Sequence, residues 1–234
     1  MCDSASLTWS AHIRLLFQQY SLPDPLTLLS SQPWSKERWR VLTKTAVTAF
    51  HEVALREKAA GNSKLNFLNV QTIGLTGRPH PVLSGVLTTR EVPHLRIHIK
   101  MLSGDYPCYS YLGSDRNNDA ECRLCLSASP QLPAPIEDMV HLLTRCKGTA
   151  DTRNRILPDL LNSISLFSPE NDILVHPNHT HMTQLILDPT SLNLPMSIRI
   201  SPDHPAFHQV VSICRNLCFA IHKERTRKLK TLAI

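Results

Sequence analysis

The spacing of apolar residues along the chain predicts a succession of amphipathic helices. From Trp9 to Tyr20 the apolar positions recur every three or four residues, which places them on one face of a helix. Ser21 marks the end of this helix. A second, short helix is expected to begin at Asp24 and Pro25, because Asp is a favourable N-cap and Pro suits the first helical position.

A longer helix is predicted to follow, with Ser35 as its N-cap and Gly61 as a left-handed C-terminal stop. Its apolar face would be formed by Trp39, Leu42, Ala46, Phe50 and Val53. Its other face carries the cations Lys36, Arg38, Arg40, Lys44, Arg56 and Lys58. Such a face is typical of a solvated surface, and contact with nucleic acid is the alternative.

Three more helices are predicted in the rest of the chain. One begins near Thr89 and ends at Gly104, and its apolar side would comprise Val92, Leu95, Ile99 and Leu102. Another would contain Leu160, Leu161, Ile164 and Leu166. The last extends over residues 206–229, and its apolar face would be formed by Val210, Ile213 or Cys214, Leu217 and Ile221.

The predicted fold class is therefore mostly α, with a small metal-binding module inserted between helices. We expect an N-terminal helical region over residues 1–87 and a zinc-binding module with flanking helices over 88–166. A loop-rich segment with a basic C-terminal helix would occupy 167–234. Residues 167–205 are rich in Pro, Asn and His, which favours loops there.

Composition and charge exclude several classes of protein. The 234 residues hold no apolar run long enough for a membrane span, and residues 1–16 lack the pattern of a secretory signal. An intracellular protein, nuclear or cytoplasmic, is therefore expected. The seven cysteines are an odd number in a chain without a signal peptide, which argues against a disulfide framework.

Three of those cysteines form a motif with one histidine. Cys122, Cys125, His141 and Cys146 have the spacing C-x2-C-x15-H-x4-C. Two cysteines separated by two residues can bind one metal ion from a tight turn, and a second pair completes a tetrahedron. Three thiolates and one imidazole leave no coordination position open. The spacing therefore predicts a structural Zn²⁺ site rather than a catalytic one.

Around this motif the sequence resembles the zinc-binding region downstream of the polymerase in non-LTR (LINE-type) retrotransposon reverse transcriptases. In that family a basic helix ends in a Leu-Thr/Ser-Gly turn, followed by the Cys and His pairs and by a downstream Arg. Here residues 101–104 (MLSG), the four ligands and Arg153 occupy those places. Residues 33–60, 183–190 and 214–229 are similar to the flanking stretches of such elements.

The resemblance implies an accessory nucleic-acid-binding region of a reverse transcriptase that binds RNA or DNA without sequence choice. The chain has no Asp-Asp pair of the kind that holds the polymerase's two metal ions, so we expect no enzymatic activity. The polymerase domain of the parent protein would be a separate partner. The alternative is a zinc-stabilised structural or protein-interaction module without nucleic-acid contact.

Two basic clusters are the candidate contacts with nucleic-acid phosphates. The first surrounds the zinc motif and comprises Arg123, Arg145, Lys147 and Arg153. The second lies on the last helix and comprises Lys223, Arg225, Arg227 and Lys228. Residues 222–230 contribute +4 of the net charge of +6. A solvated helix end, with cations favoured by the helix dipole, is the alternative for this cluster.

The sequence contains four weaker candidate features. Pro158-Asp159 and Asp172 resemble a restriction-like endonuclease pair, although a coincidental match is favoured. His176, His179 and His181 suggest a second metal site or exposed loop histidines. Cys214 and Cys218 share a helix face and are expected in the core. The alternating tyrosines at 106, 109 and 111 offer stacking surfaces for bases.

Overall fold

The computed structural model describes residues 9–30, 34–72, 80–83, 88–108, 120–128, 133–165, 178–191 and 205–232. These residues are helical, joined by turns, with no named strand among them, which confirms the mostly α fold class. A single pair of residues, Glu121 and Ile136, forms an isolated antiparallel bridge. None of the helices in the described ranges combines the length and apolarity needed to cross a bilayer.

The chain divides into two compact units. The first comprises Met1–Gly61 and Ile73–Arg78, and the second comprises Asn62–Thr72 and Pro79–Ile234. The three segments expected from the sequence differ from this division. The physical reason is that the metal-binding region and the last helix bury their apolar faces against each other, so they form one unit.

The first unit contains α1 (Trp9–Gln19), α2 (Pro25–Ser30) and α3 (Lys36–Ala60). Aromatic rings join α1 and the residue after it to α3. The ring centroids of Phe17 and Trp39 are 5.6 Å apart, and those of Tyr20 and Phe50 are 5.0 Å apart in an edge-on arrangement. The Ser35 hydroxyl accepts from the Arg38 N–H as the predicted N-cap. Gly61 ends α3 with a φ of −79°, so the predicted left-handed stop is wrong.

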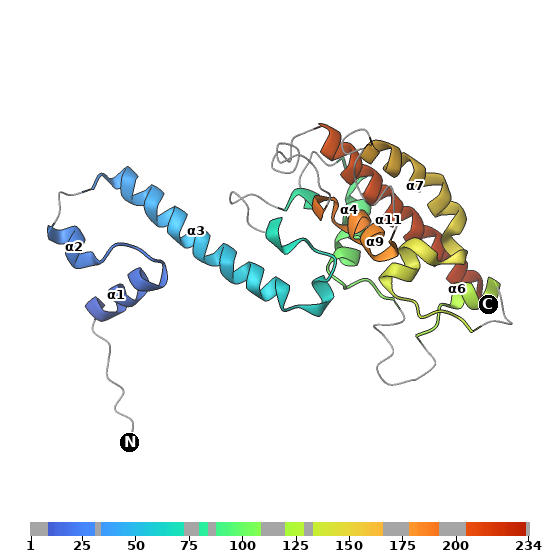
Figure 1. Cartoon of the computed structure of the whole chain (residues 1–234), viewed down its shortest axis with the longest axis horizontal. Coiled ribbons are helices and arrows are strands. Elements are labelled where there is room, and N and C mark those ends of the chain that lie inside the picture. Colours follow the sequence, from blue (N-terminus) through green and yellow to red (C-terminus); the bar gives the residue numbers. More distant parts are fainter. Residues whose placement is uncertain are drawn as a thin grey trace, which may run out of the picture. The chain divides into compact units, whose positions relative to one another are not determined.

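The second unit contains α4 (Val92–Leu102), α6 (Arg123–Ala128), α7 (Ala150–Ser165), α9 (His179–Leu187) and α11 (Pro205–Leu232). Short turns connect them: η1 (Ser63–Leu65), η2 (Val70–Thr72), η4 (Pro81–Leu83), η5 (His141–Arg145), η6 (Lys147–Thr149) and η7 (Pro189–Ser191). The long helix α11 packs along α7 and α4, and α9 lies beside it (Figure 1).

One face of α11 forms the centre of the main core. Val210, Cys214, Leu217 and Ile221 are buried, as the helical spacing predicts. Cys218 is buried as well, and this confirms that the two cysteines of α11 are core residues. The opposing side chains come chiefly from α4, α7 and α9: Met101, Leu102, Ile156, Leu160, Ile164, Met182, Leu185 and Ile186.

The structure differs from the sequence prediction at α4 and α9. Val92 and Ile99 are exposed, whereas His98 is fully buried on the face that packs against the core. The His98 ring lies 2.7 Å from the Leu187 carbonyl oxygen at the end of α9, and burial lowers the pKa of His98 to about 4. A neutral histidine thus replaces an apolar residue on this face, and α9 occupies a region expected to be loop.

Gly104 ends α4 with a φ of +70°, in the left-handed region that favours glycine. A methyl group at this position would also lie 2.7 Å from the Lys64 carbonyl oxygen. We therefore expect Gly104→Ala to destabilise the second unit by about 1–3 kcal/mol in urea unfolding. Gly61→Ala is the control, because there the new methyl lies 3.6 Å from its nearest neighbour. Equal, small effects at both glycines would contradict this prediction.

Candidate metal centre

Two short elements of the second unit carry the four residues of the Cys/His motif. Cys122 directly precedes α6 and Cys125 lies within it, so one tight turn supplies two sulfur atoms. His141 begins the π-helical turn η5, and Cys146 ends it. The Cys146 N–H donates to the His141 carbonyl oxygen at 2.7 Å, and this wide turn brings both side chains to the same side.

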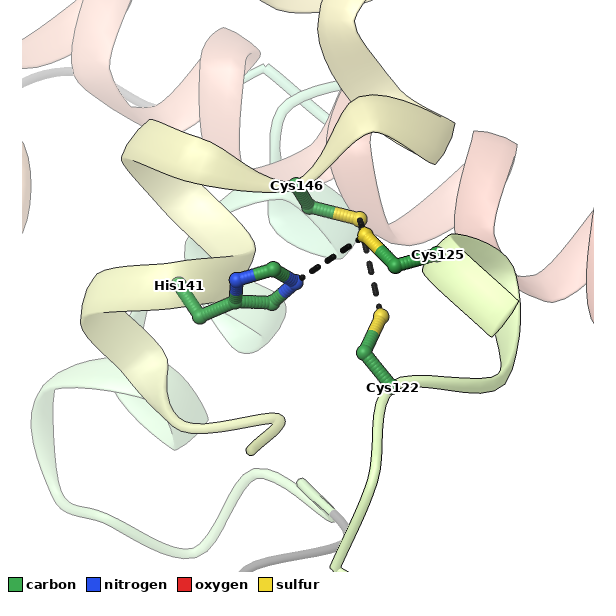
Figure 2. Close-up of side chains that lie close together, drawn as sticks. All are labelled: Cys122, Cys125, His141 and Cys146. Carbon is green, nitrogen blue, oxygen red and sulfur yellow. Dashed lines mark hydrogen bonds between the residues drawn. The ribbon is translucent and has the colours of Figure 1, made fainter. Parts of the chain in front are cut away.

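The four side chains converge on one point (Figure 2). The Cys146 sulfur lies 3.7 Å from the Cys122 sulfur and 3.9 Å from the Cys125 sulfur. The His141 Nε2 lies 3.4 Å from the Cys125 sulfur. All four residues are buried, and their ligand atoms lie within 4.8 Å of one another. Together they form a Cys3His cluster that can hold a metal ion.

The electrostatics of the cluster favour a thiolate. The hydrogen bond from the Cys122 thiol lowers the pKa of Cys146, and the neighbouring His141 ring contributes to the same shift. The same hydrogen bond raises the pKa of Cys122, and burial adds to that effect. Thiolate is the form of cysteine that binds metals, so this shift of the Cys146 pKa favours metal binding.

Backbone contacts hold the two halves of the cluster in register. The Cys122 N–H donates to the Pro135 carbonyl oxygen at 2.8 Å, and the His141 N–H donates to Asp138 Oδ1 at 2.6 Å. Gly148 lies against α6, where a Cβ atom would come 2.5 Å from the Leu124 Cβ. Only glycine permits this close approach. Neither Asp138 nor Gly148 was predicted from the sequence, because both lie outside the C-x2-C-x15-H-x4-C spacing.

The cluster also forms a small buried core of its own, separate from the main core. Its buried members are Cys122, Leu124, Cys125 and Cys146, and Leu229 of α11 packs against them. Three of the four buried side chains are thus cysteines of the cluster. Among the described residues, this small core has little apolar material besides the cysteines, whereas Met139, Leu142 and Leu143 beside His141 pack in the main core.

The last part of α11 is fixed to this region by two cations. The Arg225 guanidinium donates to Glu137 Oε1 at 2.6 Å and to the Pro107 carbonyl oxygen at 3.1 Å. Lys228 Nζ donates to the Gly148 carbonyl oxygen at 2.7 Å. The Glu137 side chain is fully buried and that of Arg225 is 8% exposed. The prediction of Arg225 as a phosphate contact is therefore wrong, because its buried guanidinium pairs with Glu137 inside the fold.

The other predicted phosphate contacts differ in their surroundings. Arg153 is partly buried and donates to the Cys146 carbonyl oxygen at 3.2 Å. Arg227 is exposed but paired with Glu224 at 2.8 Å. The exposed side chains on or next to the cluster's own elements are those of Arg123, Arg145 and Lys147, and Lys223 is exposed on α11.

The weaker candidates form no assembled site among the residues that the structure describes. Asp159 is exposed in α7, and Asp172 lies outside the described residues. His179 and His181 are exposed in the first turn of α9, while His176 is outside the described ranges, as are Tyr109 and Tyr111. Tyr106 is buried, and its hydroxyl lies 3.0 Å from His222 Nδ1. It is therefore not a stacking surface for a base.

Comparison with protein-family models, with curated proteins and with solved structures finds no match to this chain. The residues of the cluster therefore carry the functional argument, and the resemblance to reverse transcriptases stays a prediction.

The Arg225–Glu137 pair gives a test of how α11 is fixed. We expect Arg225→Met to destabilise the second unit by about 3–5 kcal/mol, because the buried Glu137 carboxylate loses the guanidinium. Glu137→Leu combined with Arg225→Met should recover most of that loss, since no charge remains buried. Urea unfolding measures both variants. Arg227→Met, which removes an exposed ion pair, is the control. If Arg225→Met lowers the free energy of unfolding no more than Arg227→Met does, the buried pair does not have this role.

Proposed function

We propose that the Cys3His cluster binds Zn²⁺ and that the chain is an accessory nucleic-acid-binding region of a retrotransposon reverse transcriptase. The geometry supports zinc. A tetrahedron with Zn–S bonds of about 2.3 Å has S–S edges of about 3.8 Å, and with a Zn–N bond of about 2.0 Å its S–N edge is about 3.5 Å. The separations of 3.7, 3.9 and 3.4 Å in the structure fit these edges. Soft thiolates in a tetrahedral set also favour zinc over hard cations.

The observation that carries the nucleic-acid proposal is the set of exposed cations fixed around the cluster. Arg145 lies between the ligands His141 and Cys146, Lys147 follows Cys146, and Arg123 follows Cys122. Ligand binding to a metal would hold their backbones in place, and the side chains of Arg145 and Lys147 are exposed to solvent. Cations of this kind contact phosphates and provide affinity without sequence choice.

The resemblance to non-LTR reverse transcriptases supports the same proposal. Arg153, which matches the family's downstream arginine, donates to the carbonyl oxygen of the ligand Cys146. On this proposal the chain would bind RNA or DNA for a polymerase domain elsewhere in the parent protein. Polymerisation would depend on that domain and not on the residues of this chain.

A zinc-stabilised structural or protein-interaction module is the second candidate function. The observation in its favour is that Arg225, Lys228 and Arg153 all donate to groups within the chain. Three of the eight predicted phosphate contacts therefore stabilise the fold. The two candidates differ in whether Arg123, Arg145 and Lys147 bind phosphates.

The zinc proposal predicts one zinc ion per chain, with loss of that ion in Cys122→Ser. Because zinc binding contributes about 10–16 kcal/mol in zinc-finger peptides, we expect the metal-free region around the cluster to lose its fixed structure. Metal content by elemental analysis and protection of the region from proteolysis measure the two effects. The control is Cys218→Ala, which removes a buried thiol of α11 and should keep the zinc. Full zinc content in Cys122→Ser would contradict the ligand set.

The nucleic-acid proposal predicts binding of RNA or DNA that weakens steeply as salt rises. We expect Arg145→Gln and Lys147→Gln each to lower the slope of log K against log salt by about 1. Arg14→Gln, at an exposed position of α1 outside every candidate contact, is the control and should leave the slope unchanged. Fluorescence anisotropy over a salt series gives these slopes. Absence of binding at low salt by the zinc-loaded protein would favour the second candidate.

A further inference from the structure

A pocket of about 250 Å³ opens beside the Cys3His cluster. Cys125 and His141 line it from the buried side, where each is 6% exposed. Pro133, Ala134 and Pro135 form an apolar wall. The exposed cations Arg145 and Lys147 complete the lining. One side of the pocket is thus apolar, and another carries two positive charges.

The size and lining of the pocket restrict what it can bind. Pockets for drug-sized ligands measure about 300–1,000 Å³, so this one admits a single small group. The apolar wall favours a group with an apolar face, and Arg145 and Lys147 favour an anion attached to it. A nucleotide has both parts: its base is flat with apolar faces, and its phosphate carries the charge.

The backbone around the cluster fixes the pocket before any ligand arrives. The Pro135 carbonyl oxygen accepts the N–H of Cys122, and the proline rings restrict φ at both ends of the wall. On the other side, the π-helical turn η5 places Arg145 between His141 and Cys146. One side of the pocket is therefore hydrogen-bonded to a residue of the cluster, and the other side lies in the chain between two of them.

We propose that this pocket binds one unpaired nucleotide, with the base against Pro133–Pro135 and the phosphate at Arg145 and Lys147. The proposal rests on the proposed nucleic-acid function and makes it more specific: the strand recognised here is single-stranded. A base in a duplex is stacked and paired, so it cannot enter without being extruded. An acidic peptide offers the charge without a flat apolar group, so it would leave the apolar wall without a partner.

The test compares two 12-nucleotide DNA strands on the zinc-loaded protein. One has bases, and the other is its abasic analogue with the same phosphates. We expect the abasic strand to bind about fivefold more weakly, the low end of the range for stacking on an aromatic ring, because the wall here is proline. Phosphate contacts alone would give equal affinities for the two strands.

Ala134→Leu provides the matched variant, because it fills the pocket from the apolar wall without changing charge. We expect it to remove the fivefold preference and to leave the affinity for the abasic strand unchanged. Ala128→Leu is the control, since this residue is exposed on α6 and does not line the pocket. Zinc content of one ion per chain shows that each variant is folded at the cluster.

The outcomes separate this inference from the proposed function. Binding of neither strand at low salt overturns both. Equal binding of the two strands by the wild-type protein overturns the nucleotide pocket and leaves phosphate binding intact. A preference that survives Ala134→Leu places the base elsewhere and also overturns the pocket. Competition by hexaglutamate as strong as that by the base-containing strand would identify an acidic peptide as the occupant.

Discussion

The turn that carries Cys122 and Cys125 depends on the Cys3His cluster, because its buried side chains pack in the small core of the cluster and not in the main core. Of the four buried side chains there, three belong to Cys122, Cys125 and Cys146. Burying a leucine such as Leu124 contributes about 1.5–3 kcal/mol, which cannot offset the entropy of ordering the turn that carries Cys122 and Cys125. The proposed zinc, at about 10–16 kcal/mol in isolated fingers, is large enough to do so. Metal binding and folding of this region would then be one process.

The helix α11 connects this region to the main core of the unit. Its residues up to Ile221 pack in the main core, and Arg225, Lys228 and Leu229 contact the cluster region. The buried pair with Glu137 is costly to break, because either charge alone would remain in an apolar environment. The end of α11 is therefore positioned by the cluster region, although the helix itself is ordered by the main core. This arrangement also divides its cations: Arg225 stabilises the fold, whereas Lys223 faces solvent.

Helical periodicity was sufficient to predict α1, α3, the last part of α7 and the buried face of α11, although Trp9 of α1 and Val53 of α3 are exposed. The ligand spacing was sufficient to predict which four side chains meet. Periodicity failed at α4, where His98 is buried through its contact with the Leu187 carbonyl oxygen and Ile99 is exposed. The cluster of cations on α11 was a poor guide at Arg225, whose partner Glu137 is distant in sequence. The burial of His98 and of Arg225 depends on a tertiary partner and not on local pattern.

The position of the pocket explains how a metal with four protein ligands can affect recognition without binding the ligand itself. Such a metal has no open coordination site, so its effect must pass through the residues it holds. Pro135 is hydrogen-bonded to Cys122, and Arg145 lies between His141 and Cys146. Ordering a rotamer-rich side chain at an interface costs about 0.5–1.5 kcal/mol, and a mobile loop adds to that cost. With the metal bound, the backbone of the pocket would already be ordered when the protein folds, so ligand binding would not have to order it. Affinity for a nucleotide would then depend on metal content even though no ligand atom contacts the metal.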